Sequence, residues 1–214
     1  FEDYDDIERI GSVRSCRTYY TYFAREYDAI YAHYGQSTFA VPYLKSVDNI
    51  NGVDGTGGNA FYRTKDKKAP HNAYTSGVKL NKTIGQLGYR TSYSDTYTGH
   101  FQFSKNTYVP AESDAKDAYK FYPSYTMNNP WFEYNESDGK YHRFQYGGKH
   151  NGDGGQIAVN NVIFQYVEWG HYASTDYLNI NVHKGGAGYV FTGGKCVPAV
   201  SYTHLRAHET LMNL

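Results

Sequence analysis

The side chains best suited to chemistry lie between Gly11 and Asn72, in the first part of the chain. Three arginines, two histidines, a serine and an asparagine occur there near the predicted ends of helices and strands. They are Arg14, Ser15, Arg17, His33, Arg63, His71 and Asn72. Guanidinium groups bind carboxylate or phosphate through planar, bidentate hydrogen bonds, and imidazole transfers protons near neutral pH. The set predicts a pocket for an anionic or polar ligand, a catalytic centre, or a polar network without a ligand.

The two arginines Arg14 and Arg17 immediately precede a helix that is predicted over residues 18–25. The start of a helix carries unpaired N–H groups and a partial positive charge, which adds to the attraction for an anion. We therefore expect both guanidinium groups in an anion pocket. The alternative is that they form ion pairs with acids of the same chain, such as Asp28 or Asp54, and hold loops together.

Cys16 is a candidate nucleophile because it lies between the two arginines, where positive charge would lower the pKa of its thiol. His33 or His71 could then act as the base. No catalytic motif supports this role. Cys16 is not followed by the Gly or Trp of a known catalytic elbow, and Ser15 does not lie in a Gly-x-Ser-x-Gly motif. A small cysteine packed beneath a helix explains the residue equally well. The second cysteine, Cys196, permits a disulfide with Cys16 but does not predict one.

The two histidines each have a functional and a structural interpretation. His33 ends the apolar run 29–32, so we expect it at the carboxyl end of a short buried strand, where α/β folds bind ligands. The alternative is a ring that only bonds the backbone. His71 follows Pro70 in a basic loop after Arg63, and the proline fixes how this loop approaches a ligand. The alternative there is a solvated basic face.

The sequence predicts no metal ion and no cofactor. Before the last fifteen residues, no histidines have His-x-x-x-His or His-x-His spacing, and the Gly-rich segments lack the Gly-Lys-Ser/Thr of a phosphate-binding loop. His204 and His208 have metal-ligand spacing, but they lie in a tail in which we expect no function. A secondary polar cluster could form from Arg143, His150 and Asp153, with a self-satisfied turn as the alternative.

Charge excludes a nucleic-acid binder held by a global positive field, because 21 basic and 21 acidic residues give a net charge of zero. Any anion site must therefore be local. No apolar window of about eighteen residues predicts a membrane span, and the first residues lack the order of a signal peptide. The chain opens without Met, so we expect part of a longer or processed protein. The 25 tyrosines suit a carbohydrate-facing surface, because each combines an apolar ring with a polar hydroxyl.

The first part of the chain alternates helical and strand patterns. Helices are predicted over residues 18–25, 39–46 and 75–87. The last of these has Leu80, Ile84 and Leu87 on one face, a Ser or Thr available as N-cap, and Gly88 as C-cap. This pattern is typical of an α/β subdomain.

After residue 94 the helical period gives way to strand-like runs that Gly, Asn and Asp clusters separate. These runs are 99–104, 118–125, 131–134, 140–144, 156–169, 176–183 and 188–192. One hairpin is predicted through the loop 135–139 and a tight one through Gly193-Gly194. The predicted fold class is α+β: an α/β subdomain over 1–95 and a mainly antiparallel β subdomain over 96–199. Residues 200–214 resemble translated sequencing-adapter read-through, and we expect a non-native tail.

Three ordered motifs resemble the YerB-like family of bacterial lipoproteins, a domain family without an assigned biochemical function. They are Gly-Ser-Val-Arg-Ser-Cys-Arg, Glu-Tyr-Asp-Ala-Ile-Tyr-Ala-His-Tyr-Gly, and Phe-Tyr-Arg followed by Ala-Pro-His-Asn, with Tyr141-His-Arg and Asn160-Asn-Val-Ile-Phe-Gln in the second half. The resemblance covers roughly residues 7–197. It implies that the seven polar residues between Arg14 and Asn72, together with Pro70, occupy the family's recurrent polar positions. Members of the family have Pro at the position of Ser12 and Ala at the position of Cys16. The alanine further weakens the hypothesis that Cys16 is a nucleophile.

The resemblance also implies an exported, extracytoplasmic protein that a lipid anchor outside this sequence attaches to the membrane, with strands before Phe1 and a β subdomain completed beyond this chain. We therefore expect an envelope lipoprotein module that binds a polar or anionic cell-wall or envelope ligand, and no nucleic acid, through an Arg/His pocket. One alternative is a cell-wall hydrolase or transferase with His33 or His71 as general base. The other is a structural or scaffolding domain without a ligand. The sequence leaves the oligomeric state open.

Overall fold

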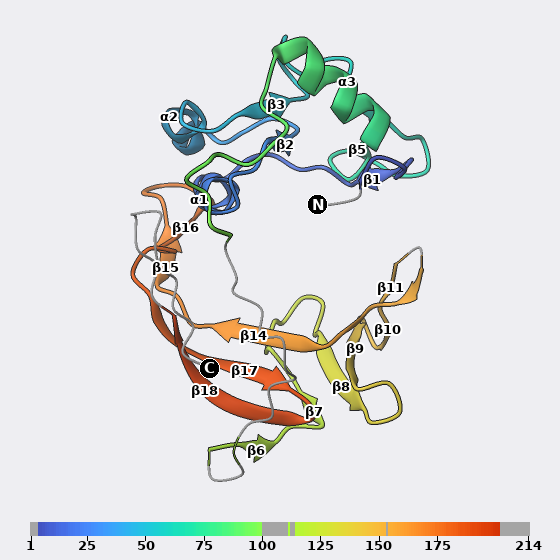
Figure 1. Ribbon diagram of the computed structural model, residues 1–214, viewed down its shortest axis with the longest axis vertical. Coiled ribbons are helices and arrows are strands. Elements are labelled where there is room, and N and C mark those ends of the chain that lie inside the picture. The colour runs from blue at the N-terminus through green and yellow to red at the C-terminus, as the bar shows by residue number, and fades with distance from the viewer. Residues whose placement is uncertain (1–3, 100–110, 112–113, 153, 202–214) are drawn as a thin grey trace. The chain divides into compact units, whose positions relative to one another are not determined.

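The computed structural model describes residues 4–99, 111, 114–152 and 154–201, and it confirms the α+β class. The chain forms two compact units, which are described separately (Figure 1). The N-terminal unit contains the described residues up to 99 and the segment 169–182. The β unit contains the described residues from 111 to 168 and from 183 to 201. The segment 169–182 therefore leaves the β unit and belongs to the N-terminal unit.

The helices of the N-terminal unit are α1 (Thr18–Glu26), α2 (Val41–Leu44), which follows a 3₁₀ turn at Thr38–Ala40, and α3 (Gly77–Leu87). All three lie where the sequence predicts helices. The signals at the ends of α3 are confirmed: Ser76 Oγ accepts a hydrogen bond from Lys79 N at 3.3 Å, and Gly88 ends the helix with a φ of 67°. A positive φ costs glycine little, which is why it terminates this helix.

The strands of the N-terminal unit form three small sheets. β1 (Ile10–Gly11), β5 (Ala73–Thr75) and β4 (Tyr62–Arg63) pair in that order, antiparallel. β2 (Tyr31–His33) and β3 (Asn49–Asn51) form a parallel pair. β15 (Trp169–His171) and β16 (Leu178–Ile180) form a hairpin.

The core of the N-terminal unit lies under α3. Ile50 and Ile84 are buried together with Ala60 and Phe61, and Leu80 and Leu87 pack against them. The predicted apolar face of α3 therefore faces the core, as its 3.6-residue period requires. Burial of this face provides the main stabilisation of the helix.

The hairpin β15–β16 packs on the beginning of α1 and on the 3₁₀ turn. The ring of Tyr172 stacks on Phe39 with centroids 4.0 Å apart and planes 4° from parallel, and its hydroxyl donates to Thr18 Oγ1 at 3.0 Å. Tyr177 meets Phe39 edge-on, with centroids 6.0 Å apart. These contacts fix the hairpin against residues more than a hundred positions earlier in the chain.

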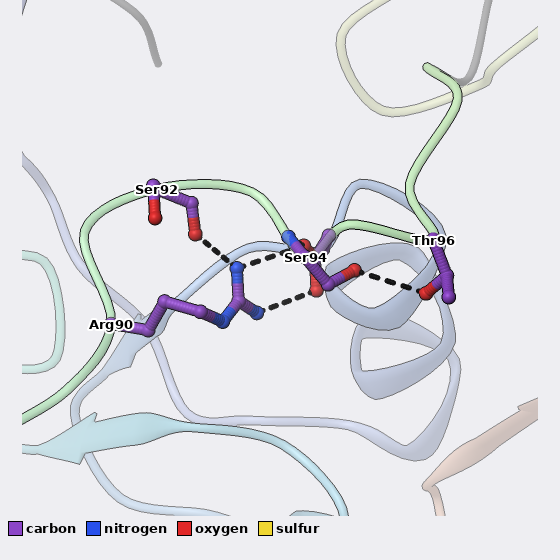
Figure 2. A network of polar contacts seen from close by, with 5 residues as sticks. Arg90, Ser92, Ser94 and Thr96 are labelled. Carbon is purple, nitrogen blue, oxygen red and sulfur yellow. Dashed lines mark hydrogen bonds and ion pairs between the residues drawn. The ribbon is translucent and has the colours of Figure 1, made fainter.

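The segment that follows α3 is tied to the end of α1 by one arginine. Arg90 donates to both carboxylate oxygens of Asp28, at 2.7 and 2.9 Å, and to the carbonyl of Ser92. Asp28 also accepts from the backbone N–H of Ser94 at 2.7 Å, and Ser94 Oγ bonds Thr96 Oγ1 at 3.3 Å. Figure 2 shows this network, with the Arg90 guanidinium bonded to the carbonyl of Ser92 and Ser94 bonded to Thr96.

The β unit contains two main antiparallel sheets (Figure 1). The first has the order β10-β9-β8-β7, with β13 also on β9. Its strands are β7 (Lys120–Phe121), β8 (Trp131–Asn135), β9 (Lys140–Gln145), β10 (Gly148–Lys149) and β13 (Ala158–Val159). The predicted hairpin through residues 135–139 is confirmed as β8–β9. β11 (Asn151–Gly152) and β12 (Gly155–Gln156) form a separate pair.

The second sheet has the order β14-β17-β18-β6. Its strands are β6 (Lys116–Asp117), β14 (Asn161–Gln165), β17 (Gly186–Thr192) and β18 (Lys195–Ser201). The predicted tight turn at Gly193-Gly194 is confirmed, with φ values of 55° and 78°. The single run predicted over 156–169 divides into β12, β13, β14 and the first residue of β15. Most of the run predicted over 99–104, and the tail from residue 202, lie outside the described residues.

Aromatic rings build the core of the β unit. Phe121 stacks on Phe191 with centroids 3.7 Å apart, and Phe132 and Tyr141 surround this pair. Tyr141 is fully buried, and its hydroxyl donates to the carbonyl of Lys195 at 3.3 Å. Residues from both sheets therefore share one core. Among the described residues, no helix has the length and apolar composition needed to cross a bilayer.

Candidate functional site

Arg14 follows β1, His71 precedes β5, and the two meet at an exposed position next to this strand pair. The pairing of β1 with β5, extended by a hydrogen bond from Val13 N to Ala73 O at 2.8 Å, brings their chain segments together. Arg14 Nη1 lies 2.9 Å from His71 Nδ1, and both residues are exposed. Because a guanidinium group can only donate, His71 Nδ1 accepts, and the ring proton in this contact lies on Nε2.

Arg63 and Asn72 form a second contact beside the first. Arg63 ends β4, and its Nη1 donates to Asn72 Oδ1 at 2.6 Å. Asn72 Nδ2 donates in turn to Thr64 O at 3.2 Å, which fixes the orientation of the amide. The Arg63 guanidinium also lies over the ring of Tyr34, 4.7 Å from its centroid. A cation in this position is attracted by the negative face of the ring.

The two contacts form one group, because His71 and Asn72 are consecutive and Tyr34 N donates to Arg14 O at 3.0 Å. We name this group the Arg14–Arg63 cluster: Arg14, Tyr34, Arg63, His71 and Asn72. Among the residues that the structure describes, no carboxylate forms an ion pair with it. Two other arginines of the unit do have such partners: Arg9 pairs with Asp66 and Arg90 with Asp28, each at 2.7 Å. The cluster is therefore a local excess of positive charge on a chain with no net charge.

Ser15 contacts this cluster only through a backbone carbonyl, and Arg17 turns to another part of the unit. Ser15 Oγ donates to Tyr34 O at 3.2 Å. Arg17 Nη1 donates to the carbonyls of Ser15 and Cys16, at 3.3 and 3.0 Å, and its guanidinium lies 4.9 Å from the ring centroid of Tyr177 in the β15–β16 hairpin. The two arginines therefore do not share one anion pocket, although they are close in sequence.

The predicted alternative for these arginines, an ion pair with Asp28 or Asp54, is wrong in the described part of the chain. Asp28 is bound by Arg90, and Asp54 accepts hydrogen bonds from Asn51 and Thr56. These two acids thus hold chain segments of their own, and no carboxylate among the described residues pairs with Arg14 or Arg17.

His33 ends β2 as predicted, but its side chain faces the interior and is fully buried. Nδ1 lies 2.8 Å from Gly35 O, Nε2 lies 3.1 Å from Asn49 Oδ1, and the ring stacks on Tyr31 with centroids 5.1 Å apart. Both ring nitrogens are therefore occupied by oxygens of the protein. This corrects the expectation that His33 contacts a ligand or acts as a base.

Asn51 organises the same strand ends, and sequence analysis did not identify it. It is 2% exposed; its Oδ1 accepts from Gly35 N at 2.9 Å and from Val53 N at 3.2 Å, while its Nδ2 donates to Gln36 and Asp54. A buried asparagine satisfied on both sides holds two loops in one arrangement. An asparagine before a glycine is a common turn signal, so no pattern distinguished it.

Cys16 is not an activated nucleophile. Its side chain is fully buried, and burial raises the pKa of the thiol to about 11, the reverse of the decrease that its arginine neighbours suggested. Burial outweighs the contact with Tyr31 and the charge of Arg17, both of which lower this pKa. Cys16 and Cys196 are both free thiols.

The secondary cluster of the β unit is brought together in part. Arg143 Nη1 contacts His150 Nδ1 and lies 3.3 Å from Gln145 Oε1, and its guanidinium also stands 6.0 Å from the Phe132 ring centroid. Burial and the charge of Arg143 lower the pKa of His150. Asp153 lies outside the described residues. Within the described ranges, no group of His, Cys, Asp and Glu side chains could hold a metal ion.

Two family models match the chain. Residues 1–90 match "Protein of unknown function (DUF3048) N-terminal domain", and residues 121–200 match the C-terminal domain of the same description. The "Putative lipoprotein YerB" of Bacillus subtilis (strain 168) is 29% identical over 200 residues, which cover 89% of this chain and 57% of the relative. A crystal structure of the YerB protein from Bacillus subtilis superposes with a TM-score of 0.77 at 25% identity, over 92% of this chain and 66% of that one. The chain thus spans less than two thirds of the length of each of these relatives.

Proposed function

The chain belongs to the DUF3048 family of YerB-like proteins, and we propose that its N-terminal unit binds an anionic ligand of the cell envelope through the Arg14–Arg63 cluster. The observation that carries this proposal is the pair of exposed guanidinium groups that have no carboxylate partner among the described residues. Such groups bind carboxylate and phosphate more strongly than neutral donors do.

Each member of the cluster has a distinct role in the proposed site. Arg14 and Arg63 supply charged donors, and neutral His71 adds an N–H on the nitrogen that does not face Arg14. Asn72 and Tyr34 hold Arg63, one through a hydrogen bond and the other through its ring face. Fixed donors lose less conformational entropy on binding than free side chains, which favours affinity.

The name of a relative supports a proposal for the location of the protein. The Bacillus relative is named a lipoprotein, and we propose that this chain is likewise lipid-anchored and acts outside the cytoplasm. Anionic groups there are the carboxylates and phosphates of wall polymers. Binding is favoured over general-base catalysis, because the contact of His71 is with Arg14 and not with an acid or a hydroxyl that would orient it as a base.

Calorimetric titration at low salt with two probes tests the proposal: a glycerol-phosphate oligomer and a soluble muropeptide. At least one should bind, and Arg14→Gln and Arg63→Gln should each weaken that binding about tenfold, the effect of losing one charge-assisted contact. Arg25→Gln, which removes the same charge from an exposed position of α1, is the matched control and should change nothing. Equal binding by wild type and the Arg14→Gln/Arg63→Gln double variant would refute the site.

A further inference from the structure

We propose that a second site, for an acidic sugar of a glycan chain, lies between α1 and the β15–β16 hairpin. A depression of about 470 Å³ opens there, lined by Arg17, Tyr19, Asp176, Tyr177 and Leu178. This volume falls within the range of about 300–1,000 Å³ that is usual for small-ligand sites. The proposal does not depend on the Arg14–Arg63 cluster, since it shares no residue with it.

The walls of the depression are held in place by contacts outside it. The stack of Tyr172 on Phe39 and the bond from the Tyr172 hydroxyl to Thr18 anchor the hairpin beside the first residue of α1. Tyr177, on the same hairpin, meets Phe39 edge-on. The lining residues are therefore presented by fixed elements, which a site needs for precise geometry.

Arg17 gives the depression its preference for an anion. Its Nη1 donates to two carbonyls, and its guanidinium lies against the Tyr177 ring, so the position of the group is fixed. The N–H groups of Nε and Nη2 can still donate to a ligand. No carboxylate forms an ion pair with Arg17 in the described part of the chain. Arg17 is also the N-cap position of α1, and no side chain caps this helix. Unpaired N–H groups at the helix start add to the attraction for a negative group.

The other lining residues point to a sugar. Asp176 is exposed and offers carboxylate oxygens that accept hydrogen bonds from hydroxyl groups. Tyr19, Tyr177 and Leu178 add apolar surface for the C–H face of a sugar ring, and the tyrosines add hydroxyls. A saccharide with a carboxyl substituent is the class that uses all of these groups together: its acid binds Arg17, its hydroxyls bind Asp176, and its ring packs on the aromatic side chains.

Titration of the intact chain with two tetrasaccharides that differ only in acidity tests this site. One alternates N-acetylglucosamine with N-acetylmuramic acid, and the other is the uncharged N-acetylglucosamine tetramer. Wild type should bind the acidic tetrasaccharide about tenfold more tightly, and Arg17→Gln should abolish that preference. Asp176→Asn should weaken both, because it replaces one of the two oxygens that accept from hydroxyl groups with an N–H donor. Arg25→Gln and Arg14→Gln should leave both affinities unchanged.

Asp176→Asn keeps the test decisive if Arg17→Gln folds poorly, because Asp176 is exposed and this change keeps its shape. Equal affinity for the two tetrasaccharides, or binding that Arg17→Gln and Asp176→Asn leave intact, would overturn the proposal. Absence of binding to either one would do the same. Binding of D-alanyl-D-alanine alone would assign the depression to a peptide and would also overturn it. Because Arg14→Gln does not affect this site, the experiments distinguish failure of the sugar site from failure of the anion site at the Arg14–Arg63 cluster.

Discussion

Arg14 Nη1 lies 2.9 Å from His71 Nδ1, although 57 residues separate the two in sequence. A cation thus faces a neutral imidazole at an exposed position, whereas Arg9 and Arg90 of the same unit each pair with a carboxylate. An exposed contact of this kind stabilises a fold little, because water competes for both groups. We therefore expect the contact to contribute little to stability, as the proposed binding role allows.

The first prediction concerns the energetics of that contact. A double-mutant cycle of Arg14→Gln and His71→Ala, measured by urea unfolding, should give a coupling free energy of about 0.2–1 kcal/mol, the usual range for exposed pairs. Each single variant should keep nearly the full stability of the wild type while binding the anion more weakly. A coupling of several kcal/mol would identify the pair as a structural contact and count against a ligand role.

The second prediction concerns the buried amide of Asn51. Asn51→Ala should lower the free energy of unfolding by about 2 kcal/mol, because the backbone N–H groups of Gly35 and Val53 lose a partly buried acceptor. Asn59→Ala, at an exposed asparagine in the same loop region, is the matched control and should change stability by less than about 0.5 kcal/mol. Similar losses in both variants would contradict the importance of this network.

The third prediction concerns acid stability. Hydrogen bonds from Arg90, and then the backbone N–H of Ser94, hold the pKa of Asp28 below its ordinary value of 3.8. A carboxyl group whose pKa is lower in the folded protein stabilises it above the unfolded pKa, and this stabilisation is lost as pH falls through the folded value. Asp28→Asn should therefore lower the melting temperature at neutral pH, and the difference from wild type should vanish below the folded pKa. Asp95→Asn, at an exposed acid nearby, is the control; a difference that persists in acid would contradict the account.

The fourth prediction concerns Cys16. Because burial raises the pKa of its thiol to about 11, the thiolate is scarce at pH 8 and the sulfur is inaccessible. In a Cys196→Ser variant, labelling of Cys16 by a thiol reagent should be at least about a hundredfold slower in the native protein than in denaturant, since it requires opening of the fold. The raised pKa also predicts a loss of stability as pH rises from the unfolded value, near 9, towards about 11. Immediate labelling of the native thiol would show that Cys16 is reactive after all.

The sequence by itself was sufficient to predict the helices and hairpins that depend on residues close to one another in the chain. Helix α3 follows from its apolar period with Ser76 and Gly88 at its ends, and the hairpin β8–β9 follows from alternation around a polar loop. Each depends on residues within a few positions of one another, so propensity, capping and turn chemistry decide them. The order of the motifs between Gly11 and Asn72 was likewise enough to identify the family.

Only the tertiary structure decided which polar side chains share a surface. The pairing of β1 with β5 puts Arg14 beside His71, while Arg17, three residues later, turns towards a hairpin more than 150 residues away. His33 ends the predicted strand but points inward, because alternate side chains of a strand face opposite sides and a shift of one position reverses them. These outcomes depend on contacts between distant segments and on burial, which local patterns do not encode.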